Sequence, residues 1–107
     1  MKWMNDGKLV LHGRFGAKPG KRDALAANLL RAAAAMESLS ACRLYAVSTA
    51  DADPDGVWVT EIWDSAEDHA ASLKQPATRE LIAKTIPLIG AMPDRAVQIF
   101  ALGGKGL

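Results

Sequence analysis

A carboxylate and a tryptophan lie two residues apart in an otherwise apolar stretch, and a histidine follows soon after. Glu61 and Trp63 belong to the run VWVTEIW at residues 57–63, and His69 comes six residues later. In a strand with period-two alternation, Val59, Glu61 and Trp63 share one face. A carboxylate among buried side chains needs a partner, and an imidazole is well suited to moving protons near neutral pH. These residue types at this spacing predict a pocket suited to general acid–base chemistry, with an indole for one wall.

Other polar side chains could reach the same pocket. His12 and Arg14 share a strand face, so an imidazole and a fixed positive charge could hold an oxyanion together. Equally, Arg14 could pair with a carboxylate at a contact between subunits. Ser72 lies one helical turn after His69 and on the same helix face. Tyr45 could offer its hydroxyl to a ligand or simply pack in the core.

The composition is that of a single globular domain. The chain has 107 residues, of which 50% are hydrophobic, and its 13 Lys and Arg nearly balance its 12 Asp and Glu. We therefore predict one domain over residues 1–107, with a core at about 8–102 and short extensions at both ends. The formal charge of +1 and the lack of a basic stripe argue against nucleic acid as a partner.

The sequence gives no sign of a membrane segment, a secretion signal or a metal site. No stretch approaches the roughly 18 apolar residues of a membrane span. Cys42 is the single cysteine, which excludes a disulfide within the chain and fits a reducing compartment. The two histidines and this cysteine fall on separate predicted elements, without the spacing of metal ligands. We therefore expect a cytoplasmic protein that does not bind membranes and holds no metal.

Hydrophobic periodicity predicts both strands and helices. Strands are expected at residues 8–17, 41–49, 57–63 and 95–102. A long helix is expected at about 21–39, and a second one, capped by Ser65 and interrupted at Pro76, is expected to end by Gly90. The order strand, helix, strand, strand, helix, strand is that of the split βαβ arrangement. This order predicts an α+β, ferredoxin-like fold, in which a four-stranded antiparallel sheet carries the helices on one face.

One face of this sheet would have no helices to cover it. Because the strand at 57–63 is apolar on both faces, the open face must be buried, and a second copy of the chain is the simplest partner. We therefore predict a homodimer in which two sheets stack face to face. Each half would then enclose a small hollow lined by Glu61, Trp63 and residues of the first strand.

Several short motifs occur together in an order typical of one protein family. They are GRF at 13–15 with KPGKR at 18–22, CRLY at 42–45, the acidic DPD at 53–55, EIWDS at 61–65, LKQP at 73–76 and PLI at 87–89. Over residues 8–102 the chain resembles the antibiotic biosynthesis monooxygenase (ABM) domain, including its quinol monooxygenase-like members. The resemblance implies a dimeric α+β barrel. It also implies oxidation of a small phenolic or hydroquinone-type aromatic by dioxygen without metal, flavin or haem, so no cofactor is expected.

The resemblance implies a role for the tryptophan and bears on which histidine could be the base. Trp63 lies at the family's tryptophan position, where it would wall the pocket and offer its indole N–H to an oxygen intermediate, unless it only packs the core or the interface. Glu61 also matches the family pattern and would orient a base, accept a proton or form a structural bond. Many members carry a histidine at positions that here are Ser72 and Ala77. This departure argues against haem degradation and makes His69 a candidate base.

Two classes of function follow from these residues. In the first, a base removes a phenolic proton and a water-poor pocket stabilises the oxygen anion, so that dioxygen converts a phenol or hydroquinone to a quinone. The expected catalytic residues are His69, Trp63, His12, Arg14 and Glu61, with substrate contacts from Tyr45, Ser72 and Val59. In the second, the protein is a non-catalytic dimeric module that binds a small molecule, or a stress-related partner protein.

Overall fold

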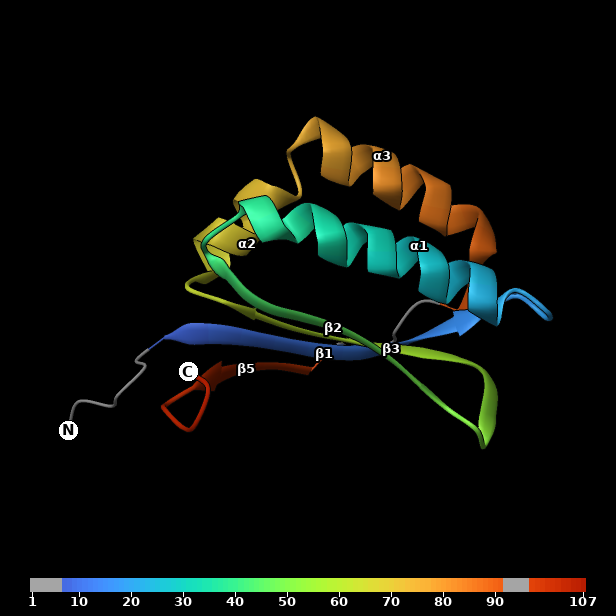
Figure 1. Ribbon diagram of the computed structural model, residues 1–107, viewed down its shortest axis with the longest axis horizontal. Helices are drawn as coiled ribbons and strands as arrows, with labels where there is room; N and C mark the ends of the chain where they lie inside the picture. The colour runs from blue at the N-terminus through green and yellow to red at the C-terminus, as the bar shows by residue number, and fades with distance from the viewer. Residues whose placement is uncertain (1–6, 92–96) are drawn as a thin grey trace.

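The computed structural model describes residues 7–91 and 97–107, and Figure 1 shows an antiparallel sheet with its helices on one side. The long strands are β1 (Lys8–Ala17), β2 (Cys42–Ala50) and β3 (Asp53–Trp63). The short strands β4 (Ile89–Ala91) and β5 (Val97–Ala101) both pair with β1. The strand order is β2-β3-β1-β4, with β5 also on β1. This arrangement confirms the predicted α+β, ferredoxin-like class, with β4 and β5 together in the place of the expected fourth strand.

The first helix packs lengthwise on the sheet. α1 (Arg22–Ala35) is rich in alanine and continues into a 3-10 turn, η1 (Met36–Ser38). The spacing of Leu25, Leu29 and Met36 places these three side chains on one stripe, and all three are buried. The stripe therefore fixes which face of the sheet α1 covers.

The other helices are short and follow β3. α2 (Ala66–Ser72) is capped by Ser65, whose Oγ accepts a hydrogen bond from the Asp68 N–H at 3.1 Å, as the sequence predicted. α3 (Pro76–Thr85) begins with proline in its first turn and ends in a 3-10 turn, η2 (Ile86–Leu88). Among the described residues, no helix has both the length and the apolar character needed to cross a membrane.

The turn between β2 and β3 is tighter than predicted. Ala50 and Asp53 still pair across the ladder, so β3 begins at Asp53 rather than at residue 57. Only Asp51 and Ala52 are left to connect the strands. The acidic residues that suggested a six-residue loop are therefore partly on the strand.

The last part of the chain differs from prediction at one point. β4 occupies residues expected to end a helix, and it pairs with Gly16 and Ala17 at the end of β1. The strand expected at 95–102 is present as β5, although residues 95 and 96 lie outside the described residues.

The two faces of the sheet have different surroundings. The inner face, under the helices, carries the buried side chains Leu9, Val57, Val59 and Trp63. On the outer face, His12 of β1 pairs with Thr60 of β3, and β5 pairs with β1 in the same register. The large apolar side chains that remain exposed on this outer face are Leu44, Val97 and Ile99. The outer face is therefore the uncovered surface that the sequence predicted.

Candidate functional site

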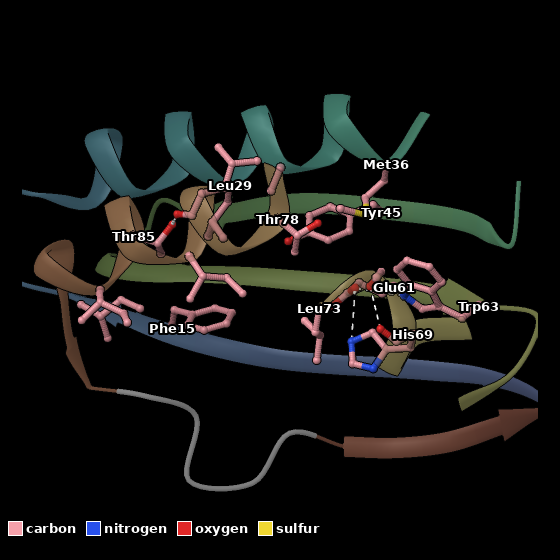
Figure 2. Close-up of a pocket in the computed structure, with 16 residues that line it drawn as sticks. Phe15, Leu29, Met36, Tyr45, Glu61, Trp63, His69, Leu73, Thr78 and Thr85 are labelled. Atoms are coloured by element: carbon pink, nitrogen blue, oxygen red, sulfur yellow. Dashed lines mark hydrogen bonds and ion pairs between the residues drawn. The ribbon is translucent and has the colours of Figure 1, made fainter. Parts of the chain in front are cut away.

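A cavity of about 340 Å³ lies between the helices and the inner face of the sheet (Figure 2). Its lining is mostly apolar and comes from β1, β2, β3, β4, all three α-helices and both 3-10 turns. The full set is Phe15, Leu29, Ala32, Met36, Tyr45, Glu61, Trp63, His69, Ser72, Leu73, Thr78, Leu81, Ile82, Thr85, Ile86 and Ile89. The prediction that Glu61 and Trp63 line a hollow between two stacked sheets is therefore wrong in its location. The hollow that they line lies within one chain, under the helices.

Glu61, Trp63 and His69 form a compact cluster in this cavity. The Trp63 Nε1–H donates a hydrogen bond to Glu61 Oε1 at 3.0 Å. His69 Nε2 lies 4.0 Å from the same carboxylate oxygen. The Trp63 and His69 rings meet edge to face, with centroids 5.4 Å apart and planes at 65°. One carboxylate oxygen thus faces both an indole N–H and an imidazole.

The local sequence explains how these three residues meet. Strand alternation places Glu61 and Trp63 on the same inner face of β3. The chain then turns at Asp64, and the Ser65 cap starts α2 directly over the strand end. His69 lies one turn into that helix, so its ring points back toward the strand, as Figure 2 shows. The whole cluster is therefore built by one strand–turn–helix segment.

The backbone hydrogen bonds at the two ends of the helix that carries His69 are long. The His69 N–H donates to Ser65 O at 3.3 Å, and the Leu73 N–H donates to His69 O at 3.4 Å. Both distances exceed the usual range for an N–H···O bond. The Ser72 Oγ compensates in part, because it donates to His69 O at 2.6 Å.

Burial controls the protonation of the carboxylate and the phenol. Burial raises the pKa of Glu61, while the hydrogen bond from Trp63 and the nearby His69 oppose that rise. Burial also raises the pKa of Tyr45, and the neighbouring Glu61 and Cys42 raise it further. Tyr45 therefore keeps its phenolic proton and can act as a hydrogen-bond donor in the cavity.

Trp63 is not free to serve the role first predicted for its indole. Its side chain is 1% exposed and walls the cavity, as expected. Its N–H, however, is already donated to Glu61 rather than left for an oxygen intermediate. The indole N–H therefore serves as a hydrogen-bond donor to the Glu61 carboxylate.

Val59 is not among the residues that line the cavity. It is buried in the core with Leu25 and Leu29, under α1. The two other predicted contact residues, Tyr45 and Ser72, do line the cavity. The structure therefore brings together two of the three side chains expected to touch a substrate.

His12 and Arg14 share a strand face, as predicted, but it is the outer face. His12 Nδ1 is 2.9 Å from Thr60 Oγ1. Arg14 donates two hydrogen bonds to the Asp53 carboxylate, at 2.7 and 2.9 Å, and its guanidinium lies 5.8 Å from the centre of the Trp58 ring. This pairing lowers the pKa of Asp53. The expectation that both side chains point into the cavity with Glu61 is therefore wrong, because the sheet separates them from it.

Two threonines of α3 line the cavity and were not among the predicted site residues. Thr78 and Thr85 are both buried, and they occupy the helix face of Leu81 at spacings of three and four residues. The same spacing is visible in the sequence, so the buried face of α3 could have revealed them. Thr85 also accepts a hydrogen bond from Asn28 of α1 at 2.6 Å, which ties α3 to α1.

Three large apolar side chains line the cavity and are also exposed. They are Leu73 at the end of α2, with 44% of its surface exposed, and Ile82 and Ile86, at 41% and 60%. The cavity therefore opens to solvent past an apolar rim. No group of three or more His, Cys, Asp or Glu in residues 7–91 and 97–107 is arranged to hold a metal ion.

Comparison with known proteins places this site in a family context. The family model described as antibiotic biosynthesis monooxygenase matches residues 9–84. Three similar solved structures each carry the name "putative antibiotic biosynthesis monooxygenase". The one from Chloroflexus aurantiacus J-10-fl is 41% identical, with a TM-score of 0.83 over 92% of this chain and 96% of that one. Those from Deinococcus radiodurans and Nitrosomonas europaea are 23% and 13% identical, with TM-scores of 0.76 and 0.81, over 90% and 89% of this chain and 94% and 90% of theirs. No curated protein matches the chain.

Proposed function

Because the chain belongs to the antibiotic biosynthesis monooxygenase family, we propose that it is a monooxygenase that oxidises a small phenolic or hydroquinone-type aromatic with dioxygen and no cofactor. The observation that carries this proposal is the half-buried Glu61 carboxylate, which accepts the Trp63 indole N–H and faces His69 in an apolar cavity. A phenolic hydroxyl that reaches this cluster meets a proton acceptor, while its ring lies among apolar side chains.

The first proposed step is removal of the phenolic proton. Ground-state dioxygen is a triplet and reacts slowly with closed-shell molecules, so the substrate must first become electron-rich. His69 takes the proton at Nε2, and the Glu61 carboxylate, 4.0 Å away, stabilises the imidazolium that forms. This separation is longer than a hydrogen bond, and catalytic pairs commonly tighten only when substrate binds.

The remaining steps balance without an external reductant. The phenolate passes one electron to dioxygen, and the radical pair joins in a C–O bond at a ring carbon that still carries hydrogen. The imidazolium returns its proton to the peroxide. Loss of the ring C–H proton to His69 then breaks the O–O bond and forms a carbonyl, and the expelled hydroxide takes that proton and leaves as water. One phenol and one dioxygen give one quinone and one water, and the substrate supplies all four electrons.

The cavity must also stabilise negative charge on oxygen. The Trp63 N–H is committed to Glu61, so we assign this role to the Tyr45 hydroxyl and to protonated His69. Both side chains line the cavity, and fixed donors are most effective where water is scarce. The apolar lining supports this assignment, because it limits the water that could compete for the anion.

We extend the proposal to a homodimer formed through the outer face of the sheet. Leu44, Val97 and Ile99 are 40%, 49% and 53% exposed on this face, and a sheet face with such side chains is usually covered. A second copy offers the same surface by two-fold symmetry. Sedimentation at micromolar concentration tests this part, and a well-folded monomer would overturn it. We also propose a cytoplasmic location, because the single cysteine cannot form a disulfide within the chain and this fits a reducing compartment.

Oxygen uptake with a panel of phenols and hydroquinones, run with a chelator present, tests the proposed reaction. We expect uptake by the wild-type protein and its loss in His69→Ala. His12→Ala should retain uptake, because His12 lies on the opposite face of the sheet. If no compound is oxidised although ligands still bind the cavity, the protein is the non-catalytic binding module instead.

A further inference from the structure

Three hydroxyl side chains from the helices line the cavity, and two of them already have partners. The Ser72 Oγ donates to His69 O at 2.6 Å. The Thr85 Oγ1 donates to Leu81 O at 2.7 Å and accepts from Asn28 Nδ2 at 2.6 Å. Thr78 forms no side-chain hydrogen bond with any other residue that the structure describes.

Thr78 lines the cavity, and its hydroxyl keeps access to solvent. The Thr78 residue is only 8% exposed, and it lies in the first turn of α3 on the buried helix face. Within the described chain, every fully buried side-chain nitrogen or oxygen has a hydrogen-bond partner. Because Thr78 has none, its oxygen is not sealed in the core. The hydroxyl is therefore available to a water molecule or to a polar group of a ligand in the cavity.

Thr78 lies at a distinct place in the cavity. Figure 2 shows it between Phe15, toward one end, and the Glu61 and His69 cluster, toward the other. It comes from α3, whereas Glu61 comes from the sheet and His69 from α2. A ligand with one hydroxyl at the Glu61 and His69 cluster would therefore present a different part of its ring system to Thr78.

The size of the cavity allows a ligand to reach both places. An apolar cavity of about 150 Å³ is large enough to bind benzene. The cavity here is more than twice as large, at about 340 Å³. A single phenol ring would leave much of it unfilled, while a two-ring compound with oxygens on both rings could span it.

We propose that Thr78 is a specificity-determining residue, which binds a second oxygen of the substrate while Glu61 and His69 hold the first hydroxyl. The inference rests on the proposed function, because that function places the first hydroxyl. A threonine hydroxyl can both donate and accept a hydrogen bond. Thr78 therefore suits a hydroxyl on the substrate and equally a carbonyl on the quinone product. The substrate class is narrowed to aromatics with two separated oxygen functions.

Binding of two matched ligands under argon tests this inference without turnover. The probes are 2,6-dihydroxynaphthalene and 2-naphthol, which lacks the second hydroxyl, and the measurement is isothermal titration calorimetry. We expect the wild-type protein to bind the diol about three- to tenfold more tightly, the effect of one neutral hydrogen bond. Thr78→Val should remove this preference and leave the affinity for 2-naphthol unchanged. Thr78→Ser keeps a hydroxyl and should retain the preference.

Several results would overturn the inference. They are a wild-type protein that binds neither ligand or does not prefer the diol, a Thr78→Val variant that loses both ligands equally, and a Thr78→Ser variant that behaves like Thr78→Val. The proposed reaction fails separately. Preference for the diol under argon, with no oxygen uptake in air by any panel compound, would refute the reaction and leave the role of Thr78 intact.

Discussion

Replacing Glu61 with glutamine removes one negative charge from the cavity and changes little else. The glutamine side chain has the same length, and its amide oxygen can still accept the Trp63 N–H that now reaches Oε1 at 3.0 Å. What is lost is the charge that faces His69 Nε2 at 4.0 Å. The variant therefore tests whether this carboxylate stabilises an imidazolium during the reaction.

The geometry sets the expected size of the effect. Opposite unit charges about 4 Å apart interact by about 4 kcal/mol at an effective dielectric constant of about 20. The two side chains are 18% and 23% exposed, so water screens part of this energy. A loss of about 2 to 4 kcal/mol in the transition state corresponds to a fall in kcat of about 30- to 1000-fold. This range overlaps the usual contribution of general acid–base catalysis.

The assay compares kcat from oxygen uptake for wild type, Glu61→Gln and a matched control, Glu67→Gln. Glu67 is an exposed carboxylate in the first turn of α2 and does not line the cavity. Circular dichroism confirms that each variant is folded. A Glu61→Gln variant within threefold of wild type would refute the electrostatic reasoning, as would an equal loss in Glu67→Gln.

Three further predictions concern the segment from β3 to α2 that builds this cluster. The folded protein binds the Glu61 proton more tightly than the unfolded chain, because burial raises the Glu61 pKa above 4.5. The protonated form of Glu61 therefore contributes to the stability of the folded protein. This contribution is complete below about pH 4.5 and is lost as the pH rises through the raised pKa. Urea unfolding should therefore show Glu61→Gln gaining stability relative to wild type as the pH rises above about 4.5, and a pH-independent difference would contradict this assignment. Ser65→Ala should lower the free energy of unfolding by about 1 kcal/mol through loss of the α2 cap, while Ser65→Asp should preserve it; equal loss in both would show that capping is not the cause. Trp63→Phe removes the hydrogen bond that lowers the Glu61 pKa, so the acidic limb of the pH–kcat profile should move to higher pH, and an unmoved limb would mean that Glu61 does not control it.

The sequence was sufficient to predict which residues of β3 share a face, but not to predict where the cavity lies. Strict alternation fixed Glu61 and Trp63 on one side of the strand, and the structure agrees. Both faces of this strand are apolar, however, because Trp58 and Ile62 lie on one face and Val57 lies on the other. Periodicity cannot say which of two apolar faces the helices cover. That choice depends on long-range packing, here of the α1 stripe on Val57 and Val59.

The same limit explains the errors over His12 and Arg14. Their shared face was predictable, but its relation to Glu61 depended on the pairing register of β1 with β3. Register is set by contacts between distant segments, and here His12 is opposite Thr60 while Leu11 is opposite Glu61. Thr78, by contrast, was within reach of the sequence, because a polar residue on the apolar stripe of a predicted helix is a local signal.

The long backbone bonds of α2 bear on how this protein would fail on heating. Glu61 and Trp63 are anchored in a central strand, whereas His69 lies on a helix of seven residues whose end bonds, to Ser65 O and from the Leu73 N–H, are 3.3 and 3.4 Å long. Fraying of that one turn would carry the imidazole away while the sheet stays folded, since local opening costs less than global unfolding. In the proposed reaction, turnover would then be lost at a lower temperature than the far-ultraviolet signal, because the signal follows the sheet and the longer helices while catalysis needs His69 in place.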